Sequence, residues 1–241
     1  MAAEPGPVTR AVLDPDRRGD EDHALAARLC RACVTGVDVD GAAMSLLTTS
    51  VHRETLSATD PTAATLEDLQ FTLGEGACLD AARSGRPVLI PDLHDHLLTA
   101  RFPMFAAAVA EQTDVRALFA LPLQLGTINL GVLDLYRTAP GPLRRHELRD
   151  VAAATDATTV LLLGAHARAH AGGPDGSVPD GRWDERAEVH QATGMILAQL
   201  AIPAQDAFVR LRAYAFAHRR PVTEVARDVV ARRLVFTEDM D

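Results

Sequence analysis

The chain has 241 residues, of which 47% are hydrophobic and 24% charged, and its formal net charge is -9 at pH 7. This composition excludes a wholly disordered chain and predicts one or two folded domains. Apolar runs such as Val160 to Leu163 are far below the ~18–20 residues that span a bilayer, and no charged-then-apolar leader opens the sequence. We therefore expect a cytoplasmic protein with no membrane partner, and its three cysteines should be reduced thiols.

The first part of the chain predicts a disordered tail and then an α+β domain. Residues 1–19 are rich in Pro, Gly, Asp and Arg and show no period, so we predict disorder there. Residues 20–169 alternate between the two hydrophobic periods. Helices are expected at Asp20–Val34, Leu66–Phe71, Cys78–Arg83, Arg101–Ala110 and Pro142–Ala169, and strands at Gly41–Ser50, Arg53–Thr59, Val88–Ile90, Ala117–Leu125 and Leu130–Arg137. Helices interleaved with strands in this order are typical of an α+β fold.

Two segments of this domain, "GEGACLDAARSGRPVLIPDL" and "ALPLQLGTINLGVLDLY", resemble a GAF domain. The likeness spans residues 20–168. It implies a sensory module built on an antiparallel sheet flanked by helices. It also implies a small-molecule ligand over the sheet, or a role in protein contacts only, and the residues do not say which.

A linker and a helical module complete the chain. Residues 170–181 contain four Gly and two Pro without a hydrophobic stripe, which predicts a flexible linker. Residues 182–236 show three amphipathic patterns, one over Asp184–Leu200, one from Pro203 and one from Val222. They predict an all-α three-helix bundle, followed by an acidic tail at 237–241.

Charge is distributed unevenly between these parts. Residues 182–236 hold nine Arg against six acidic residues, whereas residues 1–181 hold fifteen Arg against twenty-four. Only the C-terminal module could attract a polyanion.

The string "HQATGMILAQLAIPAQDAFVRLRAYAFAHRRPVTEVARDVVARRL" resembles an ANTAR domain, the RNA-binding antitermination module of bacterial regulators. The order GAF then ANTAR is similar to a class of actinobacterial regulators. The resemblance implies binding to hairpins in nascent mRNA leaders, in the context of RNA polymerase, so that transcription termination is prevented. We expect a homodimer that pairs through the helices Asp20–Val34 and Pro142–Ala169.

Charge and helix geometry indicate which residues could contact RNA, because RNA loops are read by Arg contacts, hydrogen bonds and aromatic stacking. Gly194 needs a separate argument: a Gly inside a helix costs roughly 1 kcal/mol relative to Ala, so either another helix or a nucleobase should approach it closely. Tyr214 also fits a core position. The candidate RNA-binding residues are Arg186, His190, Gln191, Thr193, Gly194, Arg210, Arg212, Tyr214, Arg219 and Arg220.

Two competing functions come from other classes. Cys78 lies in a Gly-rich segment similar to that of GAF-like enzymes that reduce free methionine sulfoxide, which would need Cys30 or Cys33 as resolving cysteine. A helix-turn-helix DNA-binding protein is the other, because "RRPVTEVARDVV" resembles the first helix of that motif. Too little chain follows for a recognition helix, so RNA is preferred over DNA.

No motif in the sequence predicts catalysis, a cofactor or a metal. Cys30 and Cys33 form C-x-x-C within a helix, without a second pair at zinc-finger spacing. His94 and His96 lie in a polar loop, where His is usually solvated. The chain lacks a P-loop and a dinucleotide-binding Gly motif. We therefore predict a regulator without enzymatic activity.

Overall fold

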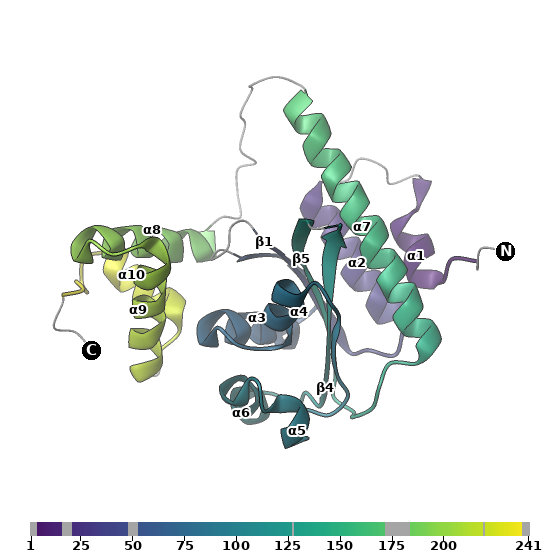
Figure 1. The fold of residues 1–241 in the computed structure, drawn as a ribbon, viewed down its shortest axis with the longest axis horizontal. Coiled ribbons are helices and arrows are strands. Elements are labelled where there is room, and N and C mark those ends of the chain that lie inside the picture. The colour runs from purple at the N-terminus through teal and green to yellow at the C-terminus, as the bar shows by residue number, and fades with distance from the viewer. Residues whose placement is uncertain are drawn as a thin grey trace. The chain divides into compact units, whose positions relative to one another are not determined.

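The computed structural model describes residues 4–15, 21–47, 53–126, 128–171, 184–218 and 220–237. The chain divides into two compact units, Met1–Pro174 and Asp175–Asp241. Each unit has its own set of elements (Figure 1).

A five-stranded antiparallel sheet forms the centre of the N-terminal unit, with strand order β2-β1-β5-β4-β3. The strands are β1 (Gly41–Leu47), β2 (Arg53–Ala58), β3 (Val88–Ile90), β4 (Ala117–Leu125) and β5 (Ile128–Arg137). The helices of this unit are α1 (Pro7–Val12), α2 (Asp22–Gly36), α3 (Pro61–Leu73), α4 (Ala77–Ser84), α5 (His96–Thr99), α6 (Pro103–Gln112) and α7 (Arg145–Ala171). This arrangement confirms the predicted α+β class.

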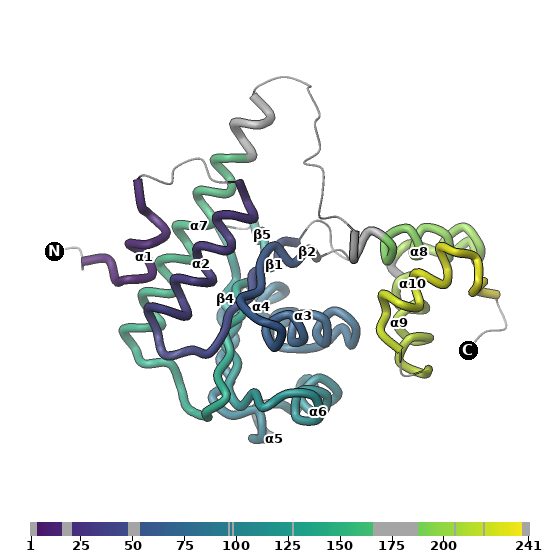
Figure 2. Tube along the Cα trace, turned by 180° about the vertical axis from the view of Figure 1, so that it is seen from behind, coloured from purple at the N-terminus to yellow at the C-terminus, as the bar shows by residue number. Residues whose placement is uncertain are grey.

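Helices cover both faces of the sheet. Successive strand residues point to opposite faces, so each strand contributes side chains to two cores. On β5, Leu133 and Leu135 belong to the core beneath α1, α2 and α7. Val132 and Tyr136 belong to a second core that includes residues of α3, α4 and α6. The two helical layers lie on either side of the sheet (Figures 1 and 2).

Local signals account for the ends of the helices around the sheet. Asp60 caps α3 by accepting a hydrogen bond from the Ala63 amide at 2.9 Å, and Pro61 opens the first turn, where its missing N–H is not needed. Gly85 ends α4 with a φ of 63°, which a glycine adopts without a Cβ clash. The predicted helix Cys78–Arg83 is therefore confirmed and extends one residue further at each end.

The prediction of disorder over residues 1–19 was wrong for Pro7–Val12, which form α1. Val8 and Val12 are buried in the core beneath α2 and α7. The Asp150 carboxylate of α7 accepts hydrogen bonds from the Val8 amide at 2.8 Å, the Thr9 amide at 3.1 Å and the Thr9 hydroxyl at 2.6 Å. Tertiary contacts thus order a segment too short to be read from its own period.

Other differences concern boundaries and masked segments. Helix α3 begins at Pro61 rather than Leu66, and the one-turn helix α5 was not predicted. Strand β5 begins at Ile128, two residues before the predicted start. The linker prediction at 170–181 and the acidic tail at 237–241 fall almost entirely outside the described residues.

The C-terminal unit consists of α8 (Asp184–Leu200), α9 (Ala204–Ala217) and α10 (Val222–Val230), as predicted. The apolar stripes of the three helices meet in its core, where Val189, Ile196, Leu211, Val225 and Val229 are fully buried. Within the described residues, no helix of the chain has both the length and the apolar character needed to cross a bilayer.

Candidate functional site

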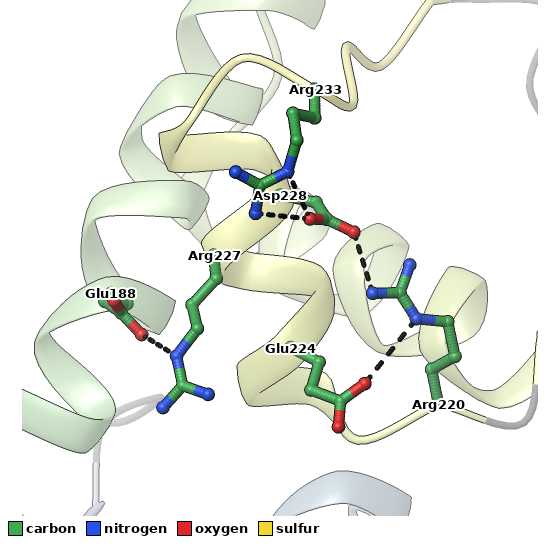
Figure 3. Close-up of polar contacts among 6 residues, drawn as sticks. All are labelled: Glu188, Arg220, Glu224, Arg227, Asp228 and Arg233. Atoms are coloured by element: carbon green, nitrogen blue, oxygen red, sulfur yellow. Dashed lines mark hydrogen bonds and ion pairs between the residues drawn. The ribbon is translucent and has the colours of Figure 1, made fainter.

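Ion pairs within the C-terminal unit engage several of its arginines (Figure 3). The Arg220 guanidinium donates to Asp228 at 2.7 Å and lies 3.8 Å from Glu224. Arg233 donates to the other oxygen of Asp228 at 2.8 Å. Hydrogen bonds from Arg220 and then Arg233 lower the pKa of Asp228 below its ordinary value. Asp228 therefore ties the segments on both sides of α10 to that helix.

A further ion pair connects two helices of the bundle. Arg227 of α10 donates to Glu188 of α8 at 2.7 Å (Figure 3). Because Arg220, Arg227 and Arg233 are all matched by acidic residues inside the unit, these three guanidinium groups are less available to a partner than the count of nine Arg suggests.

The two predicted RNA-binding arginines of α9 lie in similar surroundings. Arg210 and Arg212 are half-buried on either side of the fully buried Leu211. The guanidinium carbon of Arg212 lies 5.6 Å from the centroid of the Phe208 ring, a cation–π distance.

The Tyr214 ring also makes its contacts within the C-terminal unit. It stacks on His218 with centroids 3.9 Å apart and meets Phe236 edge-on at 5.5 Å. These contacts favour the core interpretation of Tyr214 over stacking on a base.

The predicted residues of α8 are divided between its core and solvent sides. Gln191 is exposed and His190 is half-buried. Thr193 is buried, and its hydroxyl donates to the Val189 carbonyl at 2.7 Å. Gly194 is exposed. The Arg186 side chain and all of Arg219 lie outside the described parts of the chain.

Gly194 corrects the expectation that another helix packs closely against it. Apart from its own stretch of α8, a Cβ built at this position would meet no heavy atom of the described residues within 4 Å. The glycine therefore leaves open space on the outside of α8. Of the two explanations for its presence, approach by a neighbouring helix was wrong.

Comparison with known proteins agrees with this two-unit arrangement. The GAF domain model matches residues 22–162, more than half of the chain, and the ANTAR domain model matches residues 181–230. The chain belongs to the GAF domain family. It carries a GAF domain followed by an ANTAR domain, as the two resemblances predicted. A comparison with curated proteins finds no match.

Solved structures support the fold of the GAF domain. The GAF domain of a Coxiella burnetii phosphoenolpyruvate-protein phosphotransferase aligns with a TM-score of 0.53 and 12% identity, covering 68% of this chain and 95% of that one. The GAF domain of the corresponding Acinetobacter protein gives a TM-score of 0.50 and 14% identity, with coverages of 66% and 92%. A domain of a two-component sensor histidine kinase protein from Sinorhizobium meliloti 1021 gives 0.51 and 12%, with coverages of 64% and 98%. At these identities the likeness establishes the fold alone.

The three cysteines of the GAF domain are poorly arranged for thiol chemistry. Cys78 is buried in the core beneath α3 and α4, whereas Cys30 and Cys33 of α2 are buried beneath the opposite face of the sheet. A disulfide needs Cα atoms about 4.4–6.8 Å apart, so the intervening sheet separates Cys78 from both. Burial, the largest effect, raises the pKa of Cys30 to about 12 and raises that of Cys33. Neither is poised to act as a resolving thiolate.

The ANTAR domain presents one residue that the sequence interpretation missed. Phe216 of α9 is 57% exposed. It lies off the buried stripe of Ala207, Leu211 and Ala215, and four residues after Arg212, so Arg212 and Phe216 share a helix face. The sequence did offer a signal for Phe216, since an aromatic residue outside the apolar stripe of a helix is expected to be exposed. An exposed ring is not stabilised by packing in the core, so its presence there indicates another role.

Proposed function

We propose that this protein is a transcription antitermination regulator whose ANTAR domain binds hairpins in nascent RNA under the control of its GAF domain. The observation that carries the proposal is the ANTAR match over residues 181–230, on a basic three-helix unit attached to a sensory fold. We place the protein in the cytoplasm, where nascent RNA and RNA polymerase are found. We assign it no catalytic reaction.

Two sets of residues form the RNA-contacting positions that we propose, and all of them are exposed except the half-buried Arg212. On α8, Gln191 and Gly194 are three residues apart and therefore neighbours on one face. The missing Cβ of Gly194 lets a sugar–phosphate chain or a base approach the helix backbone. On α9, the Phe216 ring offers a stacking surface for an unpaired base, and Arg212 lies one helical turn before it on the same face.

The remaining candidates have different places in this proposal. His190 and Arg210 are half-buried and flank the two sets, so we keep them as secondary contacts. Thr193 and Tyr214 make contacts inside the unit, and we leave them out of the surface. Arg186 and Arg219 remain predictions. Arg220 is a poor probe of RNA binding, since its loss would also remove its bonds to Asp228 and Glu224.

Gly194→Ala separates RNA contact from folding. The added methyl meets no protein atom and should stabilise α8 by about 1 kcal/mol. If RNA approaches the backbone there, the same methyl should weaken binding of a hairpin with an unpaired loop, measured by gel shift at fixed salt. Ala213→Ser, which adds one heavy atom to an exposed position of α9, is the matched control. Unchanged hairpin affinity in a stabilised Gly194→Ala variant would remove α8 from the interface.

Phe216→Ala tests the stacking surface in the same assay. Loss of one base–aromatic stack should cost about 1–3 kcal/mol of binding, or roughly 5- to 150-fold in Kd. Val209→Ala is the control, because Val209 is exposed to a similar degree on the same helix and has no π face. Equal losses in both variants would mean that the ring does not stack on RNA.

The same assay decides between RNA and DNA, and an enzyme assay tests the remaining alternative. Duplex DNA competing as well as the hairpin would favour the helix-turn-helix alternative. The thiol-reductase alternative predicts reduction of free methionine sulfoxide that depends on Cys78. The burial of Cys78 on the far side of the sheet from Cys30 and Cys33 argues against this activity.

We further propose that the protein acts as a homodimer. The predicted pairing helices correspond to α2 and α7. Part of both helices is covered by α1, whose residues Val8 and Val12 pack into their core. Val160 of α7 is 54% exposed, and we propose this outer side of α7 as the contact between copies.

A further inference from the structure

Three side chains from distant parts of the GAF domain converge inside its core. Glu67 of α3, Cys78 of α4 and Asp134 of β5 each place a carboxylate oxygen or the thiol sulfur within 4.8 Å of the others. Their exposed fractions are 1%, 0% and 3%. Acidic groups are common on protein surfaces without binding anything. Burying two carboxyl groups and a thiol together in an apolar core costs free energy unless other interactions compensate for it.

The fold positions each member of this cluster. Asp134 lies on the same face of β5 as Val132 and Tyr136, two residues to either side, which pack against α3 and α4. Glu67 and Gln70 are three residues apart on α3 and so share a face of that helix. Cys78 is the second residue of α4.

A hydrogen-bonded frame surrounds the three groups. The Gln70 side-chain amide donates to Asp134 at 2.9 Å and its oxygen accepts from the Cys78 amide at 2.7 Å. The Ser45 hydroxyl donates to Glu67. These donors are neutral, so they orient the two carboxyl groups without adding positive charge. Outer hydrogen bonds of this kind are what hold metal ligands in place.

The close approach of Gln70 to α4 depends on Gly76. Its φ is 139°, and a Cβ there would lie 2.6 Å from the Gln70 side-chain oxygen. Only glycine combines this backbone conformation with that contact. The "GEGAC" turn thus brings the start of α4 onto Gln70 and places Cys78 in the cluster.

The donor set matches one class of ion. A thiolate and two carboxylates suit a divalent transition metal such as Zn²⁺ or Co²⁺ rather than the all-oxygen preference of Mg²⁺ or Ca²⁺. Bonds of about 2.3 Å to sulfur and about 2.0–2.2 Å to oxygen keep ligands of one ion within roughly 4.5 Å of each other. The three ligand atoms lie within 4.8 Å of one another, so the side chains would have to draw closer together to bind one ion.

We propose that Glu67, Cys78 and Asp134 bind one divalent transition-metal ion in the core of the GAF domain. The ion would offset two of the three negative charges of the ionised ligands and link α3, α4 and β5. This site is independent of RNA binding, and it differs from our sequence-based expectation of no metal.

Cobalt is the most direct probe, because a Co²⁺–thiolate bond has a charge-transfer absorption band that Co²⁺ bound only by carboxylates lacks. Full-length protein, stripped of metal and kept reduced, is titrated with Co²⁺ and then Zn²⁺. We expect one equivalent of Co²⁺ with a thiolate band that Zn²⁺ abolishes, and a higher melting temperature of the GAF domain with either ion. Failure of the wild-type protein to develop the band would overturn the proposal without any variant.

Variants then assign the ligands. Cys78→Ser should abolish the thiolate band. Glu67→Gln should weaken Co²⁺ binding by at least about 10-fold, because loss of a residue that only hydrogen-bonds to a metal ligand already weakens binding by that much, and loss of a ligand should cost no less. Cys33→Ala, on the other face of the sheet, should keep the band. A band that persists in Cys78→Ser or disappears in folded Cys33→Ala would contradict the assignment. Hairpin binding by the ANTAR domain is measured separately, so a negative metal result leaves the RNA proposal standing.

Discussion

The roles of three single residues depend on more than the local sequence pattern. Asp228 is one acidic residue among many, yet it accepts bonds from both Arg220 and Arg233. Phe216 stands outside the apolar stripe of α9 and therefore remains exposed. Gly194 faces open space, so packing within the ANTAR domain does not offset the loss of helix stability that a glycine causes.

Asp228 makes the ANTAR domain sensitive to acid. The folded state lowers the pKa of Asp228, so the unfolded state binds the proton more readily. The stabilisation is complete above the unfolded value of about 3.9 and is lost as pH falls through the lower folded value. We expect Asp228→Asn to be less stable than wild type near pH 7 and the two proteins to converge in acid, as followed by urea unfolding at several pH values. A constant difference down to the lowest pH would rule out this ion-pair origin.

At the scale of elements, the strength of the local pattern decided what could be predicted. The sequence predicted β4 with its observed bounds, because nine apolar-rich residues end at a Gly-containing turn. The helices of the ANTAR domain were found because each repeats its stripe over two or more turns. Helices α1 and α5 span only six and four residues, too few for a period to emerge. Packing, not propensity, stabilises helices of this length.

Helix α1 depends on Asp150 for its docking. Asp150→Ala would leave the Val8 and Thr9 amides buried without their acceptor, and we expect a loss of about 2–3 kcal/mol in the free energy of unfolding of the GAF domain. Urea unfolding measures the loss, and amide hydrogen exchange should show faster exchange over residues 7–12. Asp156→Ala, at an exposed position of the same helix, should change stability by less than about 0.5 kcal/mol. Equal effects of the two variants would contradict a specific docking role.

At the scale of the whole molecule, the chain joins a sensory fold to a helical output unit, and each has its own core. The formal charge of -9 conceals a basic C-terminal module, and in the structure Arg220, Arg227 and Arg233 of that module form ion pairs within it. The number of arginines alone therefore overstates the positive surface available to RNA.

The homodimer proposal also belongs to this scale. Wild-type protein at micromolar concentration should scatter light as a dimer, and Val160→Arg should shift it toward monomer, because a charge buried between two α7 helices would be unpaired. Leu97→Arg places the same charge on α5, where the side chain is 90% exposed, and should leave the dimer intact. A monomeric wild-type protein would refute the proposal, and dimers in both variants would move the interface away from α7.

The sequence by itself determined the two domains, the order of their principal helices and strands, and the excess of positive charge in the C-terminal module. These properties follow from hydrophobic periods, turn residues and charge counts, which depend only on residues that are close together in the sequence. Only the tertiary structure decided that Glu67, Cys78 and Asp134 meet, that α1 docks on Asp150, and which arginines of the ANTAR domain are neutralised. Each of these depends on contacts between segments that are separate in the sequence, and no local pattern encodes which distant side chain will arrive.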